Sequence, residues 1–382
     1  MQEVIAASPR TQQVEQIDDV GQFAAIEAAW ERLAEVERSP FLRHAWLRCW
    51  WNAFGGARRL RIYVLWDGDD LAAAFPLSIG RRRLESLAGP LAPDFRPLAR
   101  DAEARRVVVD AALADAGELV LRGLDVDAPA ARTLALAARE QGFLVRAYHM
   151  HRSPLVETHG EEGTYLTGLD GSFRRHLARR RRKLEREHAT SWRVGADPQD
   201  LEAELTAVLE LEAAGWKGRD RGAVLCSPAM TDFYRALSRA FHAAGRLRID
   251  TIAVDGRLAA AQICLLDFDR LWMLRTAYDE SLRSYGPGLL LSFAAVEWCF
   301  ATGLEAFELL GDEQKWKHQL GTAAHEHAVF RLYRARPLPL ARFACRQVAL
   351  PLVRRYAAGG RLRRSLTRSL VAGSDQSRLR SD

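Results

Sequence analysis

The order of elements between residues 247 and 302 constrains the fold more than any other part of the chain. Leu247–Asp267 reads as a β-hairpin about the tight turn Asp255-Gly256. Leu271–Tyr278 reads as a third strand, and a loop rich in Gly and Pro then leads into the apolar helix Leu289–Thr302. A hairpin, a third strand and a helix in this order predict a sheet with a helix packed against it.

The first part of the chain also alternates between helices and strands, and its 382 residues are enough for two domains. We expect an α/β (α+β mixed sheets) fold with one domain over 1–155, a second over 156–335, and a basic helix and tail over 336–382. The boundary is expected within His149–Gly171. The further elements expected are the helices Gln22–Arg38, Phe41–Phe54, Ala128–Gln141, Ser172–His188, Leu201–Ala214 and Pro228–Ala244, and the strands Leu60–Trp66, Leu71–Ile79, Glu118–Leu121, Leu144–Tyr148 and Ala306–Leu310.

The bulk composition is that of a globular protein, with 48% hydrophobic and 27% charged residues. No apolar run approaches the roughly 20 residues of a membrane-spanning helix, and no secretory signal is visible at the N-terminus. The five cysteines are scattered and the histidines have no carboxylate or thiolate companions at ligand spacing. We therefore expect a cytoplasmic protein with neither a disulfide framework nor a metal site. Cys264 and Cys299 are expected to be buried packing residues.

Lysine is rare in this chain, because only four of its 55 basic residues are lysines. So strong a preference for arginine is typical of coding bias, and the net charge of +6 alone therefore says little about nucleic acid. Where arginine fills the ordinary basic positions, a retained lysine indicates a need for its compact ammonium or its adjustable pKa. The four are Lys183, Lys217, Lys315 and Lys317.

The loop Arg283-Ser284-Tyr285-Gly286-Pro287-Gly288 is a candidate phosphate site. It lies between a strand and an apolar helix, and a helix N-terminus attracts anions through its free N–H groups. Gly286 and Gly288 allow close approach of the backbone, Pro287 suits the first helical position, and Arg283 adds a charged donor. The plain structural alternative is a Gly/Pro turn before a core helix.

Residues 172–320 resemble the GNAT-superfamily acyltransferases grouped with CelD-like cellulose-biosynthesis proteins, and more distantly the Fem-type aminoacyltransferases. Residues 20–155 resemble the degenerate first GNAT-like half of such two-domain proteins. The resemblance implies two GNAT-like domains, each a mixed, largely antiparallel sheet flanked by helices. The order and spacing of the matching segments, rather than any one motif, supports the resemblance. Those segments are Phe173–Leu177 with its arginine run, Gly215-Trp216-Lys217-Gly218, Thr276–Asp279 with Gly286–Leu290, and Leu310–Glu313 with Lys315.

The resemblance implies direct attack of an acceptor on the thioester of acetyl-CoA or another acyl-CoA, without a metal. Asp312 and Glu313 are then candidates for the general base or the acceptor anchor; alternatively, they pair with Lys315 or Lys317. Tyr278 and Tyr285 are candidate proton donors, although aromatic residues beside a strand are usually core. The CoA-binding residues would be Arg283, Tyr285, Gly286, Gly288 and Leu289, and the acceptor-binding residues Trp216, Lys217 and Lys315.

Two basic segments allow several interpretations. The helix Arg174–Arg186 is either a solvated face or a site for an anionic substrate, the CoA 3′-phosphate, anionic lipid or tRNA. The segment Leu338–Leu370 either packs as a helix with a disordered end or lies on a membrane surface. Trp46, Trp50 and Trp51 have near-helical spacing and are expected in the core.

Three functions agree with these patterns. The leading one is an N- or O-acyltransferase that acts on a small-molecule or polysaccharide-precursor acceptor. The second is a Fem-like transferase that uses aminoacyl-tRNA, whose binding would weaken steeply with salt. The third is a non-catalytic protein of exopolysaccharide assembly. The oligomeric state is left open.

Overall fold

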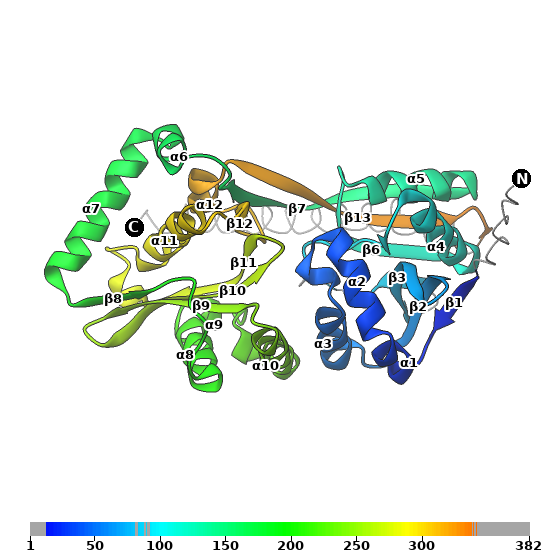
Figure 1. The fold of residues 1–382 in the computed structure, drawn as a ribbon, viewed down its shortest axis with the longest axis horizontal. Helices are drawn as coiled ribbons and strands as arrows, with labels where there is room; N and C mark the ends of the chain where they lie inside the picture. Colours follow the sequence, from blue (N-terminus) through cyan, green and yellow to red (C-terminus); the bar gives the residue numbers. More distant parts are fainter. Residues whose placement is uncertain are drawn as a thin grey trace, which may run out of the picture.

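The computed structural model describes residues 13–80, 83–87, 89, 92–337, 339 and 341. Figure 1 shows an elongated molecule in which strands run through both halves and helices cover the sheet. The described strands form one continuous sheet in the order β1-β2-β3-β4-β6-β13-β7-β12-β11-β10-β9-β8, with β5 paired to β3. The pairs β4–β6 and β11–β12 are parallel, and the other pairs are antiparallel. The predicted α/β class with a mixed, helix-flanked sheet is confirmed.

The strands are β1 (Val14–Ile17), β2 (Arg59–Asp67), β3 (Asp70–Gly80), β4 (Arg83–Ser86), β5 (Leu98–Ala99), β6 (Glu118–Asp125), β7 (Phe143–Glu157), β8 (Thr190–Arg193), β9 (Leu247–Val254), β10 (Arg257–Asp267), β11 (Arg270–Tyr278), β12 (Ala306–Glu308) and β13 (Ala323–Arg334). The α-helices are α1 (Val20–Ala25), α2 (Glu27–Glu37), α3 (His44–Phe54), α4 (Ala102–Asp115), α5 (Pro129–Glu140), α6 (Glu162–Gly168), α7 (Gly171–Glu187), α8 (Leu201–Ala214), α9 (Trp216–Arg219), α10 (Pro228–Ala243), α11 (Pro287–Thr302) and α12 (Lys315–Leu320). No helix in this part of the chain is both long and apolar enough to span a membrane.

Strand β13 joins the two halves of the molecule, which are here the described residues up to Glu157 and those that follow it. It pairs with β6 over His327–Tyr333 and with β7 over its whole length, so a strand from late in the chain lies between two strands of the first half. Strand β7 in turn continues to Glu157 and pairs with β12. The predicted boundary at residue 155 therefore falls inside a strand, and the division into two domains stays a prediction.

Several predicted boundaries are wrong in detail. The segment Gln22–Arg38 is two helices separated at Ile26, and Phe41–Phe54 begins with a short 3-10 turn before α3. The first residues of His149–Gly171 belong to β7 rather than to a loop. The predicted strand Ala306–Leu310 ends at Glu308, because Leu310 takes a left-handed conformation with φ of 49°. The predicted tail Leu338–Leu370 lies outside the described residues, apart from two isolated positions.

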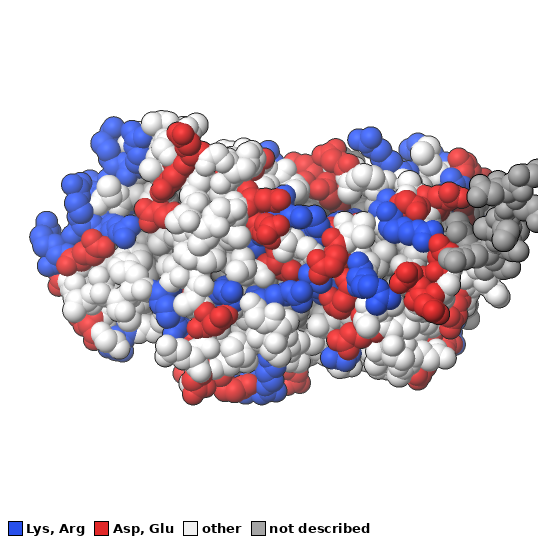
Figure 2. Space-filling view, in the orientation of Figure 1, with Lys and Arg blue, Asp and Glu red and all other residues white. Residues whose placement is uncertain are grey.

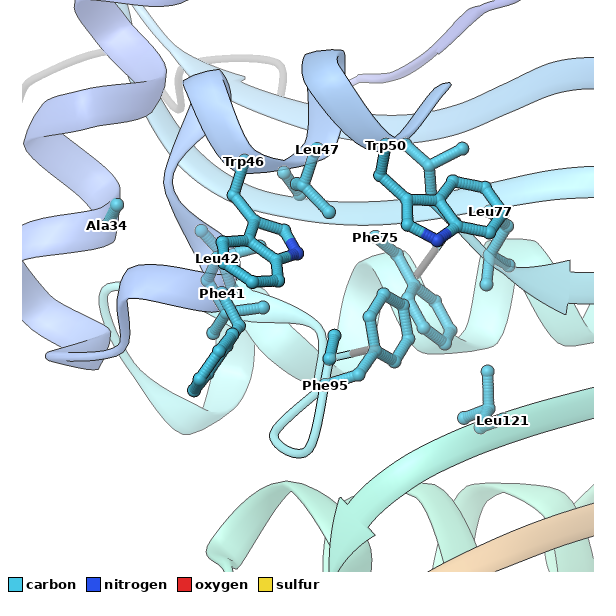
Figure 3. Close-up of a cluster of buried hydrophobic side chains, with 14 of the residues drawn as sticks. Ala34, Phe41, Leu42, Trp46, Leu47, Trp50, Phe75, Leu77, Phe95 and Leu121 are labelled. Carbon is cyan, nitrogen blue, oxygen red and sulfur yellow. The ribbon is translucent and has the colours of Figure 1, made fainter. Parts of the chain in front are cut away.

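The core of the first half continues into the second through aromatic contacts. Trp46 and Trp50 are buried beside Phe75 and Phe95 (Figure 3), which confirms their predicted core role, while Trp51 is half-buried. The Trp46 ring packs edge-on against Phe233 of α10, with the ring centroids 5.4 Å apart. A second core lies between α7, α11 and the sheet, and it includes the buried Cys264 and Cys299, as predicted.

Candidate functional site

The sheet opens between β11 and β12. The two parallel strands pair only from Arg270–Trp272 to Ala306–Glu308, after which β11 continues alone to Tyr278. The chain beyond β12 turns away through Leu310 and Gly311, both with positive φ. A cavity of about 490 Å³, here called the first cavity, occupies the opening. It is lined by Arg180, Leu211, Glu212, Gly215, Trp216, Lys217, Met273–Tyr278, Arg283, Gly286, Gly288, Leu289, Leu309–Asp312, Gln314, Trp316 and Lys317.

The predicted phosphate loop lies at the wall of this cavity. Gly286 caps α11 with φ of +66°, and Pro287 is the first helical residue, as the sequence predicts. A Cβ on Gly288 would lie 3.3 Å from Cδ1 of Tyr278, so a side chain there would enter the cavity wall. A 16-residue helix thus presents its free first-turn N–H groups beside a glycine-lined surface. The loop has the geometry of an anion cradle.

Arg180 of α7 covers this loop. A Cβ on Gly286 would lie 2.4 Å from an Nη1 atom of Arg180, so only glycine lets the guanidinium approach so closely. Burial lowers the pKa of Arg180, as does the neighbouring charge of Arg179. No carboxylate of the described residues pairs with Arg180, which therefore directs an uncompensated charge at the α11 N-terminus. Arg283 lines the same wall. Sequence patterns did not single out Arg180, because it is one of eight cationic residues on that helix.

Lys217 and its partners form the floor of the first cavity. The Lys217 ammonium donates to Oε1 of Glu212 at 3.0 Å and to the backbone oxygen of Thr276 at 2.6 Å. Glu212 is buried and also accepts the backbone N–H of Val224 at 2.9 Å. Burial lowers the pKa of Lys217, although Glu212 opposes the shift. Lys217 therefore lines the cavity, where acceptor binding was predicted, while also tying α9 to β11.

Lys317 also lines the first cavity, although the sequence patterns assigned it no binding or catalytic role. It is 7% exposed and donates to the backbone oxygen of Leu310. Burial lowers the pKa of Lys317 to about 8, against the opposing effect of Asp312. A buried amine that is partly neutral near physiological pH is suited to proton transfer. The rarity of lysine marked Lys317 in the sequence, but its burial could not be read there.

The other predicted site residues divide into two groups. Asp312, Tyr278, Leu289 and Trp216 line the first cavity together with the loop glycines, Arg283 and Lys217. Glu313, Lys315 and Tyr285 do not line it.

Two residues of the second group have partners elsewhere. Glu313 pairs with Arg152 at 3.4 Å and with His318 at 3.2 Å, not with the lysines considered in the sequence. The Tyr285 hydroxyl donates to Glu187 at 2.8 Å, which raises the pKa of Tyr285. Geometry thus gives no support to the roles predicted for Glu313, Lys315 and Tyr285.

Strand β11 carries an irregularity at the cavity. Its register with β10 passes from Arg275↔Ile263 to Met273↔Cys264, so Leu274 is an extra residue without a partner in β10. Such a bulge redirects the local backbone and is common beside active sites. Leu274 lines the first cavity, and its backbone is a candidate donor toward a bound carbonyl. Within the described chain, no group of three or more His, Cys, Asp or Glu residues could hold a metal ion.

Comparison with known proteins gives a family match for part of the chain and solved structures of similar fold. Residues 171–318, which include every residue that lines the first cavity, match the family model described as "Acetyltransferase (GNAT) domain". The chain is similar to the solved structure "Crystal structure of FemX", with a TM-score of 0.57 and 11% identity over 86% of this chain and 99% of that one. It is also similar to "The structure of L-PGS from Bacillus licheniformis", with a TM-score of 0.50 and 13% identity over 85% and 95% of the two chains. At such identities these structures show the shared fold alone.

No curated protein is similar enough in sequence to count as a match. The family match supports a transferase with a GNAT acetyltransferase domain in the second half of the chain.

Proposed function

We propose that this protein is an acyl-CoA-dependent N- or O-acyltransferase, with acetyl-CoA as donor. The observation that carries the proposal is the guanidinium of Arg180 over Gly286, at the N-terminus of α11 and the wall of the first cavity. Among the described residues, no carboxylate pairs with it. An oriented helix terminus with two arginines, Arg180 and Arg283, suits the pyrophosphate of CoA. Beyond this pyrophosphate site, the opening between β11 and β12 has space for the thioester.

We also propose the finer assignments that the resemblance suggests. Residues 156–335 would be the catalytic domain and residues 1–155 a degenerate GNAT-like domain. The acceptor would be a small molecule or polysaccharide precursor, as in CelD-like proteins, and the protein would act in the cytoplasm. The exposed carboxylate of Asp312 at the cavity mouth would anchor the acceptor.

In the proposed reaction the acceptor nitrogen or oxygen attacks the thioester carbonyl, and its proton passes to the neutral amine of Lys317. The carbonyl oxygen gains negative charge, and in this proposal the backbone N–H of Leu274, at the bulge of β11, stabilises it. The carbon–sulfur bond then breaks, and the thiolate takes a proton from the Tyr278 hydroxyl. Lys317 releases the proton that it gained to solvent, and Tyr278 recovers its proton from solvent. The products are the acylated acceptor and CoA, and both residues return to their starting protonation states.

The pH dependence of turnover tests the role of Lys317. Only the neutral amine can accept a proton, and burial lowers its pKa to about 8. We expect kcat/KM to rise with pH through about 8 and then level, whereas the variant Lys317→Arg should lose at least about a hundredfold in kcat and lack this rise. Steady-state rates from pH 6 to pH 10 are the measurement. A wild-type rate that is flat across pH 8 would exclude Lys317 as the base.

Removal of the Arg180 charge should weaken donor binding. In the variant Arg180→Met we expect the Kd for acetyl-CoA to rise about ten- to a hundredfold, because a charge-assisted hydrogen bond to phosphate is lost. The variant Arg179→Met is the matched control, since Arg179 lies on the same helix but does not line the first cavity. Calorimetric titration of both variants gives the comparison, and equal affinities would remove Arg180 from the site.

One observation favours the aminoacyl-tRNA alternative. Basic side chains gather over α7 at one end of the molecule (Figure 2), and no described acidic residue forms a salt bridge with Arg179 or Arg182. If this face binds tRNA, the affinity for aminoacyl-tRNA should fall at least about a hundredfold between 50 and 200 mM salt. Acetyl-CoA, which makes far fewer phosphate contacts, should show a much smaller dependence. Binding of aminoacyl-tRNA without binding of acetyl-CoA would replace our proposal with this alternative.

The donor can be identified without knowledge of the acceptor. We expect mass spectrometry of small molecules released from the freshly purified protein to show CoA or an acyl-CoA in the wild type. The mass of the acyl group would then define the reaction class. Release of an aminoacylated or nucleotide species without CoA would count against the proposed donor.

A further inference from the structure

A second cavity, of about 370 Å³, lies where the two halves of the molecule meet. Strands β6, β7, β11, β12 and β13 contribute to its wall, together with residues after α2 and before α5. Its volume is within the range of small-molecule sites. Leu310 lines both cavities and lies between them, and nothing in the proposed acyl transfer uses the rest of this second cavity.

The charged side chains of the second cavity neutralise one another. Glu37 pairs with Arg96 and Arg105, Asp94 pairs with Arg96, and Glu308 pairs with Arg270. His325 lies 3.3 Å from Asp125 and 3.4 Å from Glu308, and these two carboxylates raise the pKa of His325 to about 10. Carboxylates and cations therefore balance closely, which favours a ligand without net charge.

Two buried acceptors in this wall lack partners among the described residues. Glu308 is 0% exposed, and its Oε1 accepts from Arg270 at 2.6 Å, while its Oε2 has no partner. His327 is 4% exposed, and its Nδ1 has no partner. His327 also forms a hydrogen bond with the backbone of Gly123, which favours the protonated ring. Because Nδ1 has no partner in the described chain, this hydrogen bond involves Nε2, which carries the hydrogen of the neutral ring. Nδ1 of the neutral ring is then an acceptor. Burial lowers the pKa of His327 and so favours that neutral form.

Buried acceptors without a protein partner are satisfied by a hydrogen-bond donor that enters the cavity, either water or a ligand. A cationic ammonium group is unsuited, since Glu308 is already neutralised by Arg270 and by His325. An anion is unsuited because its charged oxygens accept hydrogen bonds and repel the carboxylate of Glu308. Hydroxyl groups donate without adding charge, and the aromatic rings of Phe41 and Trp272 provide an apolar wall for a carbon skeleton.

We propose that the second cavity binds a neutral polyhydroxylated compound of monosaccharide size, whose hydroxyl groups donate to Glu308 and His327. This site is separate from the first cavity and does not depend on the reaction catalysed there. Because the ligand would contact strands from both halves and Leu310, it would bind directly beside the acyl-transfer cavity.

The test uses the full-length protein and the probes D-glucose, D-mannose and myo-inositol. Saturation-transfer NMR should detect saturable binding of at least one probe to the wild type. Ethanolamine and inorganic phosphate, as cationic and anionic probes, should bind more weakly. The variant Glu308→Gln should weaken probe binding at least about tenfold, because a charged acceptor is lost. Glu305→Gln is the matched control, since Glu305 also contacts Arg270 but does not line the cavity.

Two further variants keep the test decisive. Gly288→Trp fills the first cavity and should leave probe binding unchanged. If Glu308→Gln does not fold, His327→Phe removes the second acceptor while keeping a ring in place, and it should weaken binding in the same way. The proposal is overturned if the wild type binds no probe, or if ethanolamine or phosphate binds more tightly than the three polyhydroxylated probes. It is also overturned if folded Glu308→Gln or His327→Phe binds these probes like the wild type, or if Gly288→Trp abolishes their binding.

Discussion

Replacement of Gly288 by tryptophan should abolish acetyl-CoA binding, with a rise in Kd of about a hundredfold or more. Gly288 lies in the first turn of α11, and a Cβ there would already meet the Tyr278 ring at 3.3 Å. An indole at this position would occupy the cavity and cover the first-turn N–H groups that we propose bind phosphate. Calorimetric titration with acetyl-CoA is the measurement.

The control for this variant is Gly163→Trp. Gly163 lies on the exposed side of α6, and a Cβ there would meet nothing within 4 Å. Gly163→Trp should bind acetyl-CoA as the wild type does, and both variants should retain a cooperative thermal transition. If Gly288→Trp is folded and binds with unchanged affinity, the loop assignment is wrong.

We expect the second large effect on the free energy of unfolding, from a substitution where the two halves of the molecule meet. Arg43 is 2% exposed and forms two hydrogen bonds with Asp267, at 2.8 and 2.9 Å, across 224 residues of sequence. Asp267, Glu31 and Glu35 raise the pKa of Arg43, although burial opposes them. In Asp267→Asn the buried guanidinium loses its bidentate partner, so we expect unfolding free energy to fall by about 2–4 kcal/mol.

Asp269→Asn is the matched substitution on the same hairpin turn. Asp269 pairs with Arg38 at 3.2 Å, but its side chain is 68% exposed, so the change should stay within about 0.5 kcal/mol. Asparagine also tolerates the left-handed backbone at this position, where φ is 57°. Urea unfolding of the two variants gives the comparison. Equal losses would show that the Arg43 network does not hold the halves together.

Local chemistry explains which elements the sequence could predict. The hairpin about Asp255-Gly256 and the start of α11 at Pro287 depend on turn and cap residues, which can be read directly from the chain. Strand β13 depends instead on partners about 200 residues away in β6 and β7. Its sequence contains two histidines, two arginines and a glutamate, so no apolar alternation marked it.

The same distinction applies to the candidate site. The loop Arg283–Gly288 was predicted because helix start, glycines and arginine are adjacent in sequence. Arg180 could not be chosen from the arginine run, since only packing of α7 against α11 shows which side chain reaches Gly286. Asp312 and Glu313 are neighbours whose patterns are equivalent, yet only Asp312 lines the cavity. Only long-range packing distinguishes these residues from their neighbours, because the local sequence patterns of the neighbours are the same.

The central claim is that the first cavity binds an acyl-CoA. The most direct measurement is a calorimetric titration of the wild-type protein with acetyl-CoA at low salt. We predict one saturable site per chain with a Kd between about 1 and 100 µM, in the range usual for enzyme substrates. Absence of binding at about 1 mM acetyl-CoA, by a protein that is folded, would contradict the proposed function.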